Sequence, residues 1–90
     1  MNITLMESKD GFEYIQDGDS KAHIIWSQEG NTMVMNETYV SEELRGQGVG
    51  RKLLDQAAEY ARENGYKMKA VCPYVAESFE KSSDYDDVKA

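Results

Sequence analysis

The sequence contains few of the residue types that several kinds of site require. Among its 90 residues there is one cysteine, Cys72, and one histidine, His23. A single thiol excludes an internal disulfide and favours a reducing compartment, and one thiol with one imidazole excludes a cysteine-based zinc site. We therefore predict a cytoplasmic protein whose site contains no metal.

Long apolar runs and positive charge are also scarce. No stretch approaches the ~20 apolar residues of a membrane span, and residues 1–4 lack the charged start of a signal peptide. The chain has 17 acidic and 10 basic residues and a net charge of −7. Because binding to nucleic acid needs a positive surface, these features argue against both a membrane and a nucleic acid partner.

The apolar residues that are present suffice for one core. Hydrophobic residues make up 40% of the chain and include six Tyr, two Phe and one Trp, which argues against wholesale disorder. A chain of this length cannot build two separate cores. We predict a single domain, residues 1–90.

The first forty residues have the pattern of strands joined by short turns. Residues 12–16, 21–26 and 32–40 are rich in β-branched and aromatic side chains, and turn signals at 17–19 and 28–31 separate them. This pattern predicts an antiparallel meander. Alternation within the third strand predicts two faces. One carries Val34, Asn36, Thr38 and Val40, and the other carries Met33, Met35 and Tyr39.

The apolar spacing then changes to that of a helix, from Val49 to Asn64, which Gly65 ends. Residues 68–72 predict a short strand that stops before Pro73, and residues 75–81 predict a second helix. A strand, a long helix and a strand in succession predict a right-handed crossover between parallel strands. The fold class is therefore α+β, with a mixed sheet and two helices.

The strongest functional signal is the loop between the third strand and the long helix. Its residues are Arg45, Gly46, Gln47, Gly48, Val49 and Gly50. Glycines are poor choices at a helix start, but they let backbone amides approach a ligand closely. The helix start also carries Arg51 and Lys52 and no acid, where the dipole favours anions. The loop therefore predicts a phosphate site.

The spacing of this loop excludes a P-loop and disfavours a dinucleotide fold. It resembles the Gln/Arg-x-x-Gly-x-Gly/Ala signature of the GNAT superfamily of N-acetyltransferases. Residues 40–54 resemble that family's strand, loop and helix, and residues 76–81 resemble its Ala-x-x-Tyr-Glu-Lys helix. The Cys-Pro-Tyr segment at 72–74 resembles a short GNAT-like subgroup.

The resemblance implies a minimal GNAT fold, in which two parallel strands splay apart and hold acetyl-CoA in the cleft between them. It implies that the pyrophosphate meets the loop amides and that the pantetheine pairs with the strand like an extra strand. Acetyl-CoA would be a co-substrate and an unidentified amine the acceptor. The cofactor-binding residues would be Thr38, Tyr39, Val40, Arg45, Gly46, Gln47, Gly48, Val49, Gly50 and Arg51.

The catalytic residues are less well specified. Phe79 stands where longer members of the family commonly have a tyrosine that protonates the leaving thiolate. Cys72 is either a buried structural thiol or a group that accepts the acetyl group, and Tyr74 is either a replacement acid or a packed aromatic. Two functions follow: acetyl transfer to an amine, slowly or through Cys72, and a non-catalytic acetyl-CoA/CoA-binding module that acts as a sensor or carrier.

Overall fold

The computed structural model describes residues 2–90, so Met1 of the predicted domain lies outside the described residues. The strands are β1 (Ile3–Leu5), β2 (Gly11–Gln16), β3 (Asp19–Glu29), β4 (Thr32–Val40) and β5 (Lys67–Ala70). The helices are α1 (Val49–Asn64) and α2 (Pro73–Lys81), with 3₁₀ turns η1 (Glu42–Leu44) and η2 (Ser83–Tyr85).

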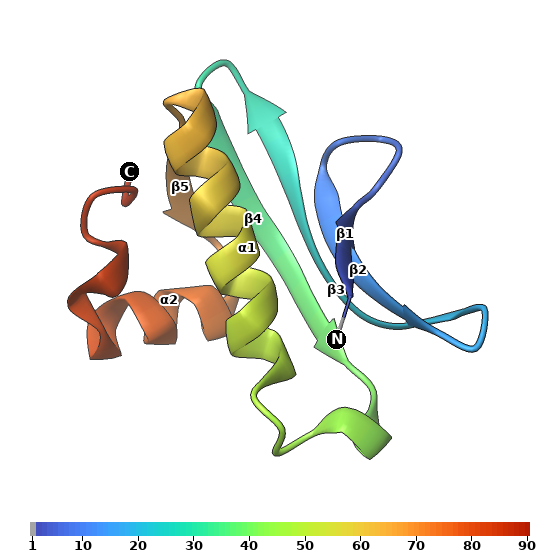
Figure 1. Cartoon of the computed structure of the whole chain (residues 1–90). Helices are drawn as coiled ribbons and strands as arrows, with labels where there is room; N and C mark the ends of the chain where they lie inside the picture. The colour runs from blue at the N-terminus through green and yellow to red at the C-terminus, as the bar shows by residue number, and fades with distance from the viewer. Residues whose placement is uncertain (1) are drawn as a thin grey trace.

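The strands form one five-stranded sheet in the order β1-β2-β3-β4-β5. Neighbours from β1 to β4 are antiparallel, whereas β4 and β5 are parallel. The crossover helix α1 lies across the sheet, and α2 lies beside it on the side of β5 (Figure 1). This arrangement confirms the predicted α+β class, the meander and the strand-helix-strand-helix order.

The boundaries of several elements differ from the predicted ones. β1 was not predicted, because three residues carry too little pattern. β3 is longer at both ends than residues 21–26. β5 ends at Ala70 rather than at residue 72, and α2 begins two residues earlier than predicted, because Pro73 occupies its first turn, where proline loses no hydrogen bond.

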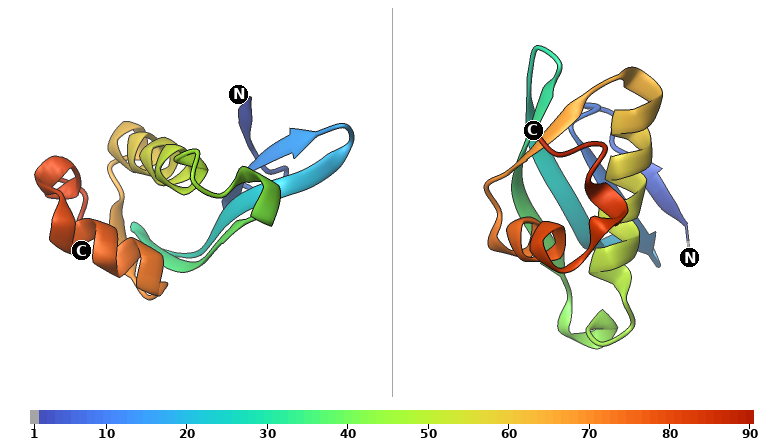
Figure 2. Two further views of the ribbon diagram at one scale, coloured as in Figure 1. Left: turned by 90° about the horizontal axis from the view of Figure 1, so that it is seen from below. Right: turned by 90° about the vertical axis from the view of Figure 1, so that its left-hand side faces the viewer.

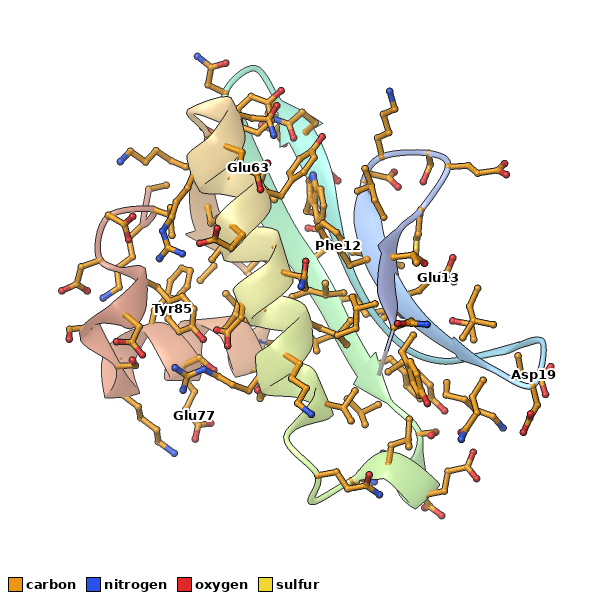
Figure 3. The ribbon with its side chains drawn as sticks, in the orientation of Figure 1. Phe12, Glu13, Asp19, Glu63, Glu77 and Tyr85 are labelled. Atoms are coloured by element: carbon orange, nitrogen blue, oxygen red, sulfur yellow. The ribbon has the colours of Figure 1, made fainter. Side chains whose placement is uncertain are left out.

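The core lies between α1 and the sheet. Small residues on the buried face of α1, Ala57, Ala58 and Ala61, are fully buried and let the helix lie close to the strands. Beside them, Tyr60 of α1 packs against Phe12 and Trp26, with ring centroids 5.9 and 5.5 Å away. Figure 3 labels Phe12 between α1 and β2.

A β-bulge changes the direction of the side chains in β4. Trp26 of β3 pairs with Met35, but Ile25 pairs with Glu37, so Asn36 is an extra residue. Beyond this bulge, Thr38 and Val40 lie opposite the buried Ile24 and Ala22, on the core face. The predictions that Tyr39 shares a face with Met33 and Met35, and that Thr38 and Val40 share one with Val34, were therefore wrong, since strict alternation assumes a regular strand.

The C-terminal segment is attached to both α1 and β5. The Tyr85 side chain is buried, and its hydroxyl donates a 2.5 Å hydrogen bond to Asp55 of α1. Burial and the neighbouring Asp55 carboxylate raise the pKa of Tyr85. Arg62 of α1 pairs with Asp87, and Val88 O accepts from Met68 N of β5 at 2.6 Å. Figure 3 shows Tyr85 between α2 and α1.

Candidate functional site

The glycine loop forms the wall of a cavity of about 210 Å³ at the N-terminus of α1, which we call the loop cavity. Its lining includes eight of the predicted site residues. They are Val40, Arg45, Gly46, Gly48, Val49, Gly50, Arg51 and Tyr74. Leu44, which sequence reasoning did not select, also lines it and is buried. In the sequence, the only feature that could have identified Leu44 is that it is an apolar residue directly before the glycine loop.

Two of the glycines are required by backbone conformation. Gly46 and Gly48 have φ angles of +84° and +72°, in the left-handed region that side chains with a Cβ rarely adopt. Gly48 is the N-cap of α1, so it turns the chain directly into the helix, and no side chain of the described residues caps that end. The next amides of the helix therefore have no intrahelical acceptor and lie beside the cavity.

The charges around the loop are arranged differently from the sequence-based expectation. Arg51 Nη2 lies 2.8 Å from Asp84 Oδ2, and its Nε lies 3.3 Å from Asp55 Oδ1. Arg51 is therefore already paired with carboxylates of the chain itself. Arg45, in contrast, has no ion pair among residues 2–90, and its Nε donates to Val40 O at 3.3 Å. Arg45 is therefore the better candidate for a ligand phosphate.

The parallel strands separate at Met35. Met35 and Ala70 are the last paired residues, and the Met35 carbonyl accepts hydrogen bonds from both Val71 N and Cys72 N. Within residues 2–90, the rest of β4, from Asn36 to Val40, has no partner strand on the side of β5. This confirms the predicted splayed pair, and the β4 bulge begins where the strands part.

The backbone of the separated part of β4 has groups available for pairing. Ser41 N donates to Lys21 O of β3, and hydrogen-bonded pairs alternate along an antiparallel ladder. This alternation directs the backbone N–H and C=O groups of Glu37 and Tyr39 toward β3. It directs those of Thr38 and Val40 toward the gap between β4 and β5. An extended ligand chain in the gap can therefore pair with Thr38 and Val40.

Cys72 lies at the inner end of this gap. It is the N-cap of α2 and is 6% exposed. Its Sγ lies 3.6 Å from Thr38 Oγ1, so the two side chains meet where the strands part. The structure thus brings Cys72 to the gap that continues toward the loop cavity, although Cys72 does not line the cavity itself.

Three residues considered at the sequence level have their side chains elsewhere. The Gln47 side chain donates to Glu43 O at 3.2 Å. Tyr39 lies on the opposite face of the sheet, where it stacks on His23 at 5.4 Å. Phe79 packs against Tyr85, with ring centroids 5.5 Å apart, and does not line the loop cavity. Backbone groups of Gln47 remain available to a ligand, whereas those of Tyr39 are directed to β3, so the prediction that Tyr39 binds the cofactor is not supported by its position.

One further polar pair lies on the sheet face that no helix covers in the described chain (Figure 2, left). His23 Nε2 and Glu37 Oε2 are 2.5 Å apart on this face. Glu37 belongs to the separated part of β4, but its side chain points away from Thr38 and Cys72.

The arrangement of a splayed parallel pair, a glycine loop and a crossover helix has a counterpart among known families. The family model for GCN5-related N-acetyltransferases matches residues 11–88. The chain belongs to this family. A search of curated proteins returned no match.

Solved structures agree with this membership of the GNAT family. An NMR solution structure of a GCN5-like protein from Staphylococcus aureus is 35% identical, with a TM-score of 0.80, over 99% of this chain and 87% of that one. Nourseothricin acetyltransferase is 29% identical, with a TM-score of 0.59, over 79% of this chain but only 46% of its own. N-acetylglutamate synthase from Neisseria gonorrhoeae, solved with coenzyme A and N-acetyl-glutamate, shares the fold, at 18% identity and a TM-score of 0.66 over 81% of this chain and 18% of its own.

Metal-binding groups and membrane-spanning helices were sought throughout residues 2–90 of this GNAT domain. Across residues 2–90, no three His, Cys, Asp or Glu side chains gather in a group that could hold a metal ion. Within the same residues, no helix is both long and apolar enough to cross a membrane.

Proposed function

We propose that this domain binds acetyl-CoA and transfers its acetyl group to an amine. GNAT proteins use acetyl-CoA, and the chain belongs to that family. The observation that carries the proposal is the continuity between the gap beside Thr38 and Val40 and the loop cavity beyond it. A pantetheine chain lying along β4 brings the pyrophosphate of the same molecule to the amides at the start of α1.

Different groups of the domain bind different parts of the cofactor. Free amides at the N-terminus of α1, together with the Arg45 guanidinium, provide donors and positive potential for the phosphates. The backbone groups of Thr38 and Val40 provide donors and acceptors for the amides of the pantetheine. The thioester then lies toward Cys72 and Thr38, at the inner end of the gap.

Transfer to an amine requires that the acceptor reach the thioester carbonyl as the neutral amine. The amine nitrogen attacks the carbonyl carbon, the carbon–sulfur bond breaks, and the coenzyme A thiolate takes up the proton that the amine loses. Cys72 offers a second route, in which its sulfur accepts the acetyl group first. A non-catalytic CoA-binding module is the second candidate. It is favoured by Phe79, which has no proton to donate and packs against Tyr85.

Ligand competition and turnover test these functions together. Acetyl-CoA is expected to raise the melting temperature, since a ligand that binds the native state adds to stability. Free CoA should compete with it, and adenosine alone should compete poorly. Competition by adenosine equal to that by CoA contradicts the proposal and indicates a nucleotide site. Release of CoA with polyamine, peptide or arylamine acceptors supports the enzyme, whereas tight binding without turnover supports the module.

The Asp84 carboxylate is expected to compete with a bound phosphate for Arg51. Changing Asp84 to Asn removes this internal anion, and CoA affinity should rise about two- to fivefold, the range for an exposed ion pair. The change should be larger at low salt. Isothermal titration calorimetry at two salt concentrations measures it. Asp86→Asn is the matched control, because Asp86 pairs with Lys89 and not with the loop. Equal effects of the two substitutions contradict the prediction.

A further inference from the structure

Tyr74 reaches the loop cavity from a different part of the chain than the rest of its lining. The other lining residues lie between Val40 and Arg51, whereas Tyr74 belongs to the first turn of α2. Tyr74 therefore forms the wall of the cavity that lies opposite the glycine loop. Its side chain is 38% exposed, so the ring is accessible to a ligand in the cavity.

The position of Tyr74 explains why the third residue of the loop without a side chain, Gly50, is a glycine. Gly50, unlike Gly46 and Gly48, has no φ in the left-handed region, so its backbone conformation does not require glycine. A Cβ on Gly50 would lie 3.1 Å from both Cζ and the hydroxyl oxygen of Tyr74. Glycine inside a helix costs about 1 kcal/mol relative to alanine. Glycine at position 50 leaves room for the phenol of Tyr74, which lies against α1 there.

The hydroxyl of Tyr74 has no hydrogen-bond partner among residues 2–90, although it lies against the first turn of α1. That turn carries free amides and the positive end of the helix dipole, and it contains no acidic residue. An anion bound to the amides would therefore also lie within reach of the phenol. A phenol is a donor, and a hydrogen bond to a charged acceptor is among the stronger ones.

We propose that the Tyr74 hydroxyl donates a hydrogen bond to the pyrophosphate of coenzyme A, which assigns Tyr74 to phosphate recognition at the start of α1. This inference rests on the proposed function, because it takes the ligand of the loop cavity to be that cofactor. It gives Tyr74 a role at the phosphate end of the ligand, whereas an acid for the leaving thiolate would act at the thioester end.

Binding of two ligands to Tyr74→Phe separates these roles. The substitution removes only the hydroxyl, so affinity for CoA should fall about 10- to 150-fold, as expected for loss of a hydrogen bond to a charged group. Affinity for pantetheine, which has no phosphate, should not change. Tyr66→Phe is the matched control, since Tyr66 lies just past the other end of α1. A Tyr74→Phe protein that binds CoA as tightly as the wild type overturns the inference, and so does an equal loss for both ligands.

A second pair of variants tests the contact between Gly50 and Tyr74. Gly50→Ala should displace the ring and weaken CoA binding, and it should have no such effect when Tyr74 is already alanine. A loss of the same size in both backgrounds overturns the inference. If the wild type itself does not bind CoA, the proposed function fails. If the wild type binds CoA but Tyr74→Phe binds it equally well, only the inference about Tyr74 fails.

Discussion

Replacing Gly48 with valine is expected to abolish the rise in melting temperature that CoA produces. Gly48 has a φ of +72° and is the residue from which α1 starts. A left-handed conformation costs a residue with a Cβ roughly 1–2 kcal/mol, and a β-branched side chain is especially unfavourable there. The valine must therefore move the loop, and the amides of the first turn lose their common direction toward the cavity. Thermal shift and calorimetry with CoA measure the loss.

A matched control separates this effect from general destabilisation. Gly18, in the turn between β2 and β3, has a φ of +82°, and a Cβ at this position would meet no atom within 4 Å, which is also true of Gly48. Gly18→Val should therefore lower the melting temperature by a similar amount. It should leave the shift caused by CoA intact, because this turn lies outside the cavity. An unchanged shift in Gly48→Val would falsify the assignment of the loop.

Incubation with acetyl-CoA is expected to give one acetyl adduct, which Cys72→Ala eliminates completely. Cys72 is the only cysteine in the chain, and its sulfur lies beside Thr38 at the inner end of the gap. In the reaction the Cys72 thiolate attacks the thioester carbonyl, and the bond from that carbon to the CoA sulfur breaks. The coenzyme A thiolate leaves and takes up a proton, so one thioester replaces another. Mass spectrometry of the intact protein measures the adduct.

The same experiment distinguishes the roles of Cys72. Cys72→Ala should retain the thermal shift with CoA, because the proposed phosphate site is at the other end of the gap. If the adduct disappears but amine turnover persists, Cys72 is a side acceptor and the amine attacks directly. If both disappear while CoA binding remains, the acetyl group passes through Cys72. An adduct that survives in Cys72→Ala lies on another residue and contradicts the prediction.

The sequence by itself determined the parts of the fold that depend on local pattern. Alternating β-branched and aromatic residues predicted the meander, and the helical spacing from Val49 to Asn64 predicted α1. The glycine loop was visible because its residue types are unusual at a helix start, so local backbone preferences alone were enough to predict a phosphate site there. Gly46 and Gly48 both have positive φ angles, which accounts for glycine at these two positions.

Tertiary structure decided the features that depend on which segments meet. The bulge at Asn36 reversed the faces of Thr38 and Tyr39, because an extra residue in one strand is defined only by its pairing with the other. Asp84 pairs with Arg51 across 33 positions of sequence, which no local charge pattern reveals. Gly50 has an ordinary backbone conformation, and only the ring of Tyr74 lying against it, from α2, gives a reason for the missing side chain.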